Sequence, residues 1–453
     1  MKKLADIKKI YFIGIGGIGM SALARFFHAK GVSVSGYDKT VTPLTRELES
    51  SGIAIHYEEN LELAPKNADA VVYTPAIPAR HAELVYYIEH QYTVVKRSDV
   101  LQWITASSFN ICVAGTHGKT TVTSMIAHLL RHSGYGCNAF LGGIAANYNT
   151  NFWSHERNVV VVEADEYDRS FLKLVPDIAI ITSMDPDHLD IYGTPVEVEN
   201  AFIQFSQKIK KDGCLVFKYG LTRTGELAGT NRFSYDFENE NAAVYASNRR
   251  VEEGNYVFDV VNSNWTIKDV VLTMGGLHNI ENSIAAIAVG KYLGITEDKI
   301  KAAIADFKGV RRRFEYALKN RHHILIDDYA HHPEELRALI SGVRSIFGKQ
   351  KLVLVFQPHL FSRTKDLVDE FAASLDLADE VILLPIYPAR ELPVEGVTSD
   401  WLMSKMTIKE KKVLSKEAMV SLLEKERPAL IVMAGAGDID AQVKNVKAIL
   451  EKK

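Results

Sequence analysis

Residues 113–121 read Val-Ala-Gly-Thr-His-Gly-Lys-Thr-Thr, and no other stretch constrains the fold as strongly. Apolar residues precede it at 109–113, and apolar residues spaced by threes and fours follow at 122–130, which predicts a strand, a turn and a helix. The backbone N–H groups at the start of a helix favour an anion. The stretch therefore predicts a phosphate loop, in which Lys119 reaches the β- and γ-phosphates of a nucleotide and Thr120 ligates Mg²⁺.

This loop is a shortened variant of the usual pattern. The common phosphate loop has a glycine five residues before the glycine of Gly-Lys-Thr, but that position holds Val113. An ordinary glycine-containing turn with a surface lysine is the alternative, and the flanking strand and helix favour the phosphate loop. We expect ATP to contact the loop residues Gly115, Thr116, His117, Gly118, Lys119, Thr120 and Thr121.

The composition is typical of an enzyme with several domains. A chain of 453 residues corresponds to about three domains, and 47% hydrophobic residues are enough for several cores. The 53 basic and 56 acidic residues give a net charge of −3, which does not favour nucleic acid or an anionic membrane as a partner. No apolar run approaches about 18 residues, and the first residues lack a signal-peptide core. We expect a cytoplasmic enzyme, either monomeric or homodimeric, without nucleic-acid or membrane partners.

A second glycine-rich turn lies near the N-terminus. The apolar residues 10–13 lead into glycines at positions 14, 16, 17 and 19, followed by a helical pattern and a strand that ends at Asp38. This order is that of a dinucleotide-type βαβ unit, whose glycines let a pyrophosphate approach the backbone. A third strand at 70–74 ends at the same edge. The unit predicts nucleotide binding, in which Asp38 is either a ligand contact or a turn residue.

Four acidic residues follow a buried strand in the middle of the chain. The strand is Asn-Val-Val-Val-Val at 158–162, and the acids lie within residues 163–168. Burying them unpaired would be costly, whereas a strand end beside a phosphate loop suits metal ligands. A solvated acidic turn is the alternative. The next strand, 178–182, leads to His188, and we expect both strand ends at one edge of a parallel sheet.

The second half of the chain combines polar strand ends with a basic cluster. Short alternating runs between 220 and 275 predict a small antiparallel sheet. The following helix places Asn279 and Asn282 on one face, where they either bind a purine or cap the helix. The three arginines at 311–313 form either a phosphate clamp or a solvated face. Later strands, separated by helices, predict another parallel α/β domain.

The predicted fold is α/β with three domains. Residues 1–106 form a Rossmann-like domain, and residues 107–315 form a central P-loop ATPase-type parallel sheet with the small antiparallel sheet attached. Residues 316–453 form a second Rossmann-like domain. This arrangement suggests that one end holds a nucleotide-like substrate, the middle consumes ATP and the other end presents a second substrate.

The ordered motifs resemble those of the Mur ligases over nearly the whole chain. The matching residues are 14–21, 115–121, 163–166, 187–188, 278–282, 312–314, 327–333 and 356–359. The resemblance implies attachment of L-alanine to UDP-N-acetylmuramate through an acyl phosphate, with ATP and Mg²⁺ or Mn²⁺, during peptidoglycan synthesis.

The resemblance also implies residue roles. Lys119, Arg313 and His331 would be catalytic. Thr120, Glu163 and His188 would bind metal, and His278, Asn279, Asn282, Arg313 and Asp328 would bind ATP. The amino acid would contact Tyr329, His331 and Arg363. The UDP sugar would contact Gly14, Gly16, Gly17, Gly19, Met20, Ser21, Asp38 and Thr74.

Three alternative functions remain open at this point. Tyr167 stands where the alanine-adding members usually have serine, and Leu360 stands where many have arginine. A tyrosine is also found in the related ligase that recycles murein peptides by joining a tripeptide to UDP-N-acetylmuramate. An NAD-dependent oxidoreductase would explain residues 10–38 but nothing after residue 105. A regulatory nucleotide-binding module would leave the acidic and histidine strand ends unexplained.

Overall fold

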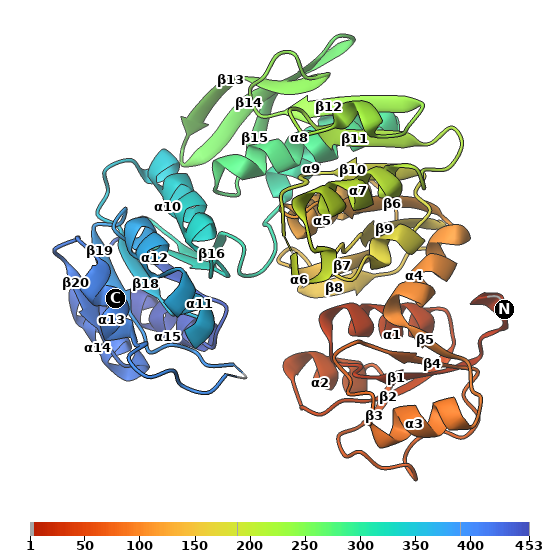
Figure 1. Ribbon diagram of the computed structural model, residues 1–453. Coiled ribbons are helices and arrows are strands. Elements are labelled where there is room, and N and C mark those ends of the chain that lie inside the picture. Colours follow the sequence, from red (N-terminus) through yellow and green to blue (C-terminus); the bar gives the residue numbers. More distant parts are fainter. Residues whose placement is uncertain (1–3, 188, 390, 453) are drawn as a thin grey trace. The chain divides into compact units, whose positions relative to one another are not determined.

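The computed structural model describes residues 4–187, 189–389 and 391–452. Its strands form three sheets, of five, ten and six strands, each accompanied by helices (Figure 1). The predicted α/β class is therefore confirmed. The chain divides into two compact units. Unit 1 comprises Met1–Ser247, Asp259–Val270 and Glu281–Ala305, and unit 2 comprises Asn248–Phe258, Val271–Ile280 and Asp306–Lys453.

The first sheet is entirely parallel and has the order β3-β2-β1-β4-β5. Its strands are β1 (Lys9–Ile13), β2 (Ser33–Tyr37), β3 (Ala54–His56), β4 (Ala70–Tyr73) and β5 (Val94–Lys96). Its helical segments are η1 (Leu4–Asp6), α1 (Ile18–Ala29), α2 (Pro43–Ser50), α3 (Ala82–Glu89) and α4 (Arg97–Ala106). The strand order reverses at β1, so the glycine turn after β1 lies at the switch point where such sheets bind ligands.

The ten-stranded sheet has the order β15-β14-β13-β12-β11-β10-β6-β9-β7-β8. Its strands are β6 (Phe109–Ala114), β7 (Asn138–Ala145), β8 (Thr150–Trp153), β9 (Val159–Glu163), β10 (Ile178–Ile181), β11 (Cys214–Lys218), β12 (Asn231–Asp236), β13 (Val244–Glu252), β14 (Asn255–Asn262) and β15 (Trp265–Leu272). The accompanying segments are α5 (Lys119–His132), η2 (Ser170–Lys173), α6 (Leu189–Tyr192), α7 (Pro195–Ser206), η3 (Thr224–Glu226), α8 (Leu277–Tyr292) and α9 (Glu297–Asp306).

The pairing of this sheet determines where the phosphate loop lies. β6 pairs in parallel with both β9 and β10, so the ends of these three strands share one edge. The strands predicted to form a small antiparallel sheet attached to the central domain continue this sheet, because β12 pairs in parallel with β11. β7 and β8 form an antiparallel pair at the other end of the sheet, and the sequence pattern did not predict them.

The third sheet has the order β16-β17-β21-β18-β19-β20. Its strands are β16 (Glu315–Lys319), β17 (Ile324–Asp328), β18 (Val353–Phe356), β19 (Glu380–Leu383), β20 (Lys411–Val413) and β21 (Leu430–Ala434). Only β16 pairs antiparallel to its neighbour among the pairings described. The helices are α10 (Pro333–Phe347), α11 (Phe361–Asp366), α12 (Val368–Leu375), α13 (Ser399–Lys405), α14 (Lys416–Glu426) and α15 (Asp440–Glu451).

Among the described residues, no helix combines the length and hydrophobicity needed to cross a bilayer.

Candidate active site

The predicted phosphate loop connects β6 to α5 in unit 1. Gly118 is the N-cap of α5 and has a left-handed backbone, with φ of 80°. Gly115 has φ of 138°, and a Cβ atom at this position would lie 2.0 Å from Thr182 Oγ1. Both positions therefore require glycine, for backbone conformation and for close approach. The loop leaves the first N–H groups of α5 at its end, as anion binding requires.

Two residues that follow β10 hold the loop in place. Ser183 Oγ lies 2.9 Å from Thr116 Oγ1 and accepts a hydrogen bond of 2.7 Å from the backbone N–H of His117. Thr182 Oγ1 donates to the backbone oxygens of Ala114 and His117. Neither Thr182 nor Ser183 was predicted as a site residue, although their place directly after a buried strand was a usable signal.

Two carboxylates at the end of β9 engage the two key side chains of the loop. Thr120 Oγ1 donates to Glu163 Oε1 at 3.0 Å, while Glu163 Oε2 accepts from the backbone N–H of Gly142 at 3.1 Å. Lys119 Nζ donates to Glu166 Oε1 at 2.7 Å. The predicted proximity of the acidic strand end and the phosphate loop is thus present in the structure.

The pair formed by Thr120 and Glu163 suits a hard cation. Both side chains offer oxygen atoms, which Mg²⁺ prefers. No group of three or more metal-binding side chains exists among residues 4–187, 189–389 and 391–452. In the usual Mg²⁺ site, one or two protein oxygens share the ion with substrate phosphates and water. His188, the third predicted ligand, lies outside the described residues.

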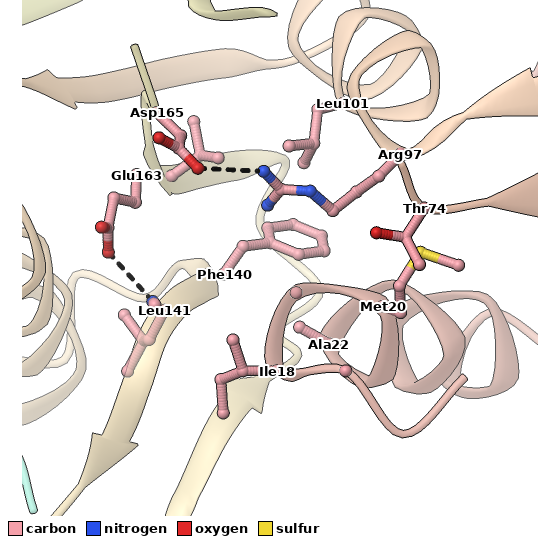
Figure 2. A pocket seen from close by; sticks show the side chains of 14 residues that line it. Ile18, Met20, Ala22, Thr74, Arg97, Leu101, Phe140, Leu141, Glu163 and Asp165 are labelled. Atoms are coloured by element: carbon pink, nitrogen blue, oxygen red, sulfur yellow. Dashed lines mark hydrogen bonds and ion pairs between the residues drawn. The ribbon is translucent and has the colours of Figure 1, made fainter. Parts of the chain in front are cut away.

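A pocket of about 320 Å³ in unit 1 adjoins the glycine turn that follows β1 (Figure 2). It brings the metal-ligand candidate Glu163 together with four of the residues expected to contact the UDP sugar. The lining residues are Gly17, Ile18, Gly19, Met20, Ala22, Thr74, Arg97, Leu101, Phe140, Leu141, Gly142, Val162, Glu163 and Asp165. A reactive group bound here would lie near the end of β9.

Arg97 supplies a cation to this pocket that the sequence analysis did not identify. Its guanidinium lies 3.5 Å from the Asp165 carboxylate (Figure 2). A Cβ atom on Gly19 would lie 2.7 Å from Arg97 Nη1, so the glycine allows the arginine to approach the start of α1. Arg97 is the first residue of α4, 78 positions after Gly19, and the spacing alone gave no signal of this contact.

Asp38 binds the glycine turn itself. Its Oδ2 atom accepts a 2.7 Å hydrogen bond from the backbone N–H of Gly16, and its Oδ1 atom accepts from the N–H of Thr40 at 3.1 Å. Gly14 is bonded to the neighbouring strand through its N–H, which donates to Tyr37 O at 2.8 Å. Ser21 Oγ accepts from Asn151 Nδ2 at 3.1 Å. These residues shape the turn.

The candidate adenine contacts lie at the start of α8. In unit 1, Asn282 approaches the phosphate loop closely, because a Cβ atom on Gly118 would lie 3.0 Å from Asn282 Oδ1. In unit 2, Asn279 is buried and its Nδ2 donates to Gly275 O at 2.6 Å, whereas His278 is exposed. The predicted helix start is confirmed, and the adenine contacts remain predictions.

In unit 2, Asp328 fixes the loop that carries the arginine cluster. Its two carboxylate oxygens accept hydrogen bonds of 2.7 Å from the backbone N–H groups of Phe314 and Ala330. Burial raises the pKa of Asp328 to about 6. Arg313 is exposed in this loop, with its guanidinium 5.9 Å from the centre of the Tyr329 ring. The carboxylate therefore positions the loop, and its predicted contact with the ATP ribose remains a prediction.

Arg312 points into unit 2 and was not a predicted site residue. Its Nη2 donates to the backbone oxygen of Gly435, and its Nη1 lies 3.4 Å from Asp440 Oδ2. The guanidinium also lies over the Tyr329 ring at 4.9 Å. Arg312 thus joins the end of β21 to the start of α15, while its neighbour Arg313 stays accessible.

The predicted amino-acid residues gather at the ends of β17 and β18. His331 Nδ1 donates to the backbone oxygen of Tyr329 at 3.0 Å, and burial lowers the pKa of the imidazole. The ring centre of His331 lies 6.0 Å from that of His359. Arg363 Nη1 is buried and has no hydrogen-bond partner among the described residues. A buried guanidinium nitrogen without a hydrogen-bond partner is suited to donate to the carboxylate of a bound ligand.

Three protein-family models match the chain in succession. They are the Mur ligase family catalytic domain over residues 9–109, the Mur ligase middle domain over residues 113–290, and the Mur ligase glutamate ligase domain over residues 312–438.

Curated relatives match the chain over its whole length. A UDP-N-acetylmuramate–L-alanine ligase from Parabacteroides distasonis is 49% identical, with 99% of each chain covered. An enzyme of the same name from Flavobacterium johnsoniae is 48% identical, again with 99% of each covered.

A solved UDP-N-acetylmuramate–alanine ligase from Thermotoga maritima superposes with a TM-score of 0.81 at 29% identity, covering 97% of this chain and 98% of that one. A murein peptide ligase from Psychrobacter arcticus has a TM-score of 0.68 at 21% identity, covering 98% and 99%, which shows a shared fold. The resemblance predicted from the motifs is confirmed, and the chain belongs to the Mur ligase family.

Proposed function

We propose that this enzyme joins L-alanine to UDP-N-acetylmuramate at the expense of ATP. The products are UDP-N-acetylmuramoyl-L-alanine, ADP and phosphate, in peptidoglycan biosynthesis. The observation that carries this function is identity of 48% and 49% over 99% of the chain to ligases of that name. The phosphate loop supports it independently, because Lys119 and Thr120 lie in a loop of the type that binds nucleotide phosphates and a metal, next to two carboxylates.

The alternatives fit less well. The murein peptide ligase shares 21% identity, which supports the fold and not the substrate. An oxidoreductase does not account for the phosphate loop or for membership of a ligase family. The glycine turn after β1 is better assigned to the pyrophosphate of a sugar nucleotide, because its geometry suits any pyrophosphate.

The first step needs two anions to approach one another. The carboxylate of UDP-N-acetylmuramate attacks the γ-phosphorus of ATP, forming an acyl phosphate and releasing ADP. Lys119 is assigned to the β- and γ-phosphates and Arg313 to the γ-phosphate, because fixed cations stabilise the charge that accumulates in the transition state. Thr120 and Glu163 would hold Mg²⁺, which neutralises phosphate charge when bound.

The second step is attack of the alanine amine on the acyl carbon, followed by loss of phosphate. The amine must first lose a proton. His331 donates from Nδ1 to Tyr329 O, so its Nε2 carries the free lone pair and is the candidate base. Arg363 is assigned to the α-carboxylate of alanine, and Tyr329 is assigned to the same amino-acid site.

We also propose the organisation that the sequence suggests. Residues 1–106 bind the UDP sugar, 107–315 bind ATP, and 316–453 bind the amino acid. The contacts of Asp38 with the glycine turn support the first assignment, and the phosphate loop supports the second. A cytoplasmic location agrees with a nucleotide-dependent reaction, and the protein is assigned as a monomer or homodimer.

A coupled assay of phosphate release tests this function. Full turnover is expected only when UDP-N-acetylmuramate, L-alanine, ATP and Mg²⁺ are all present, and a chelator should stop it. Replacing Mg²⁺ with Mn²⁺ should restore activity, since both ions accept oxygen ligands. Phosphate release at the same rate without UDP-N-acetylmuramate or without L-alanine would contradict the proposal.

His331→Gln is expected to lower kcat/KM for alanine about a hundred-fold, because a general base contributes roughly that much. The lowered pKa of His331 keeps the wild-type imidazole neutral below its ordinary value of 6.5. The wild-type to variant ratio of kcat/KM should therefore stay constant above pH 6.5 and fall in more acidic buffer, as the imidazole gains a proton. A ratio that does not change with pH would exclude His331 as the base.

A further inference from the structure

The phosphate-loop lysine is already paired with an internal anion. Lys119 Nζ donates to Glu166 Oε1 at 2.7 Å and to the backbone oxygen of Gly115 at 2.7 Å. The exposed fraction is 14% for the Lys119 side chain and 1% for Glu166. An ion pair with so little solvent around it is screened much less than one on the surface. Glu166 therefore acts strongly on the ammonium that ATP is expected to use.

Hydrogen bonds to its carbonyl hold the backbone of Glu166 in place. The Glu166 carbonyl accepts a 2.6 Å hydrogen bond from Tyr192 Oη and a 2.9 Å bond from the backbone N–H of Arg169. The Arg169 guanidinium in turn lies over the Tyr192 ring at 4.8 Å. The turn after β9 is thus bonded to α6, which fixes the backbone from which the Glu166 side chain reaches Lys119.

A second carboxylate, that of Glu163, contacts the next residue of the phosphate loop. Glu163, three residues earlier, accepts from Thr120, the residue after Lys119. The two carboxylates therefore stand where a metal ion and a triphosphate would contact the same two side chains. Glu163 has a proposed role toward the metal, whereas Glu166 has none in the reaction derived above.

We propose that Glu166 is a positioning residue of the phosphate loop, whose carboxylate competes with nucleotide phosphates for the Lys119 ammonium. Binding of ATP then exchanges one charge-assisted hydrogen bond for another, so part of the attraction of Lys119 for phosphate is offset. The same competition weakens the hold on ADP and helps the product to leave. This inference rests on the proposed function, because it requires ATP as the ligand.

Glu166→Gln tests the inference, because glutamine keeps the size of the side chain and an oxygen that accepts from Lys119 but removes the negative charge. The variant is expected to bind ADP and a non-hydrolysable ATP analogue about ten-fold more tightly in calorimetry, as losing one competing charged hydrogen bond implies. The KM for ATP should fall to match, while the KM for alanine stays unchanged. A merely structural residue would give unchanged or weaker nucleotide binding.

Asp177→Asn is the matched control. Asp177 forms a similar ion pair, with Lys210 Nζ 2.7 Å from its carboxylate, but it precedes β10. It therefore lies at the opposite end of that strand from Thr182 and the phosphate loop. Nucleotide affinity in this variant is expected to equal that of the wild type.

Glu166→Asp provides a second variant, because its carboxylate is one methylene too short to reach Lys119 from the fixed turn. Affinity should follow the order Gln, Asp, wild type, from tightest to weakest, and the nucleotide-induced rise in melting temperature should follow the same order. Folded Gln and Asp variants without tighter binding would overturn the inference, and the Asp variant alone decides if the Gln variant does not fold. A wild-type enzyme that binds neither ADP nor the analogue would instead refute the proposed function.

Discussion

Lys119→Ala is expected to lower ligase turnover at least about a hundred-fold, while UDP-N-acetylmuramate still binds with nearly wild-type affinity. Removing one fixed group that stabilises transition-state charge costs roughly this much. Lys119 does not line the pocket beside the glycine turn of β1, so binding of the sugar nucleotide should persist. Steady-state kinetics and calorimetry with UDP-N-acetylmuramate measure the two effects separately.

The control for this variant removes the charge of Glu166 together with that of Lys119. Lys119→Ala leaves the buried Glu166 carboxylate without the ammonium, and breaking a buried ion pair destabilises a fold. The double variant Lys119→Ala, Glu166→Gln avoids that cost and should be folded and equally inactive. Loss of sugar-nucleotide binding in the folded double variant would show that the first domain does not bind this substrate on its own.

Arg363→Ala is expected to raise the KM for L-alanine by about ten- to a hundred-fold and to change the KM for ATP little. Its buried Nη1 atom has no partner in the described part of unit 2, and a hydrogen bond between charged groups contributes about 1.5–3 kcal/mol. The resemblance to the Mur ligases implies an arginine where this chain has Leu360, so Arg363 is the main cation proposed for the amino-acid carboxylate. Initial rates with each substrate varied in turn measure this effect.

Two further variants serve as controls for the Arg363→Ala prediction. Arg363→Lys should restore alanine binding only in part, because an ammonium cannot form the two parallel bonds of a guanidinium. Arg337→Ala removes an arginine of α10 that is 43% exposed and paired with Glu334, and it should leave every KM unchanged. Equal losses for alanine and ATP in Arg363→Ala would mean that the residue supports the fold and does not bind the amino acid.

The sequence predicted the elements that position the site, because their signals are local. Residues 109–132 combine an apolar strand, required glycines and a periodic helix, and they form β6, the loop and α5 as expected. The glycine turn before α1 and the acidic end of β9 were likewise predicted from residues that are adjacent in the sequence. Each signal lies within one short stretch, so no knowledge of distant contacts was needed.

The missed features depend on contacts between distant segments. The acidic strand end was expected beside the phosphate loop, but the specific pair of Lys119 with Glu166, 47 positions apart, depends on the parallel pairing of β6 with β9. Arg97 reaches Gly19 for a similar reason. β7 and β8 were missed because the glycines at 142 and 143 interrupt the apolar pattern of the longer strand. Pairing of this kind is set by the folded sheet and is not visible in residue spacing.

The choice of amino-acid substrate is the most direct test of the account. L-alanine and L-alanyl-γ-D-glutamyl-meso-diaminopimelate should be supplied at equal concentration with UDP-N-acetylmuramate and ATP, and the products identified by mass. We expect UDP-N-acetylmuramoyl-L-alanine to form much faster, with slower side products if glycine or L-serine replaces alanine, because one methyl group discriminates by only about 1–3 kcal/mol. Faster formation of the tripeptide product would contradict the proposed function.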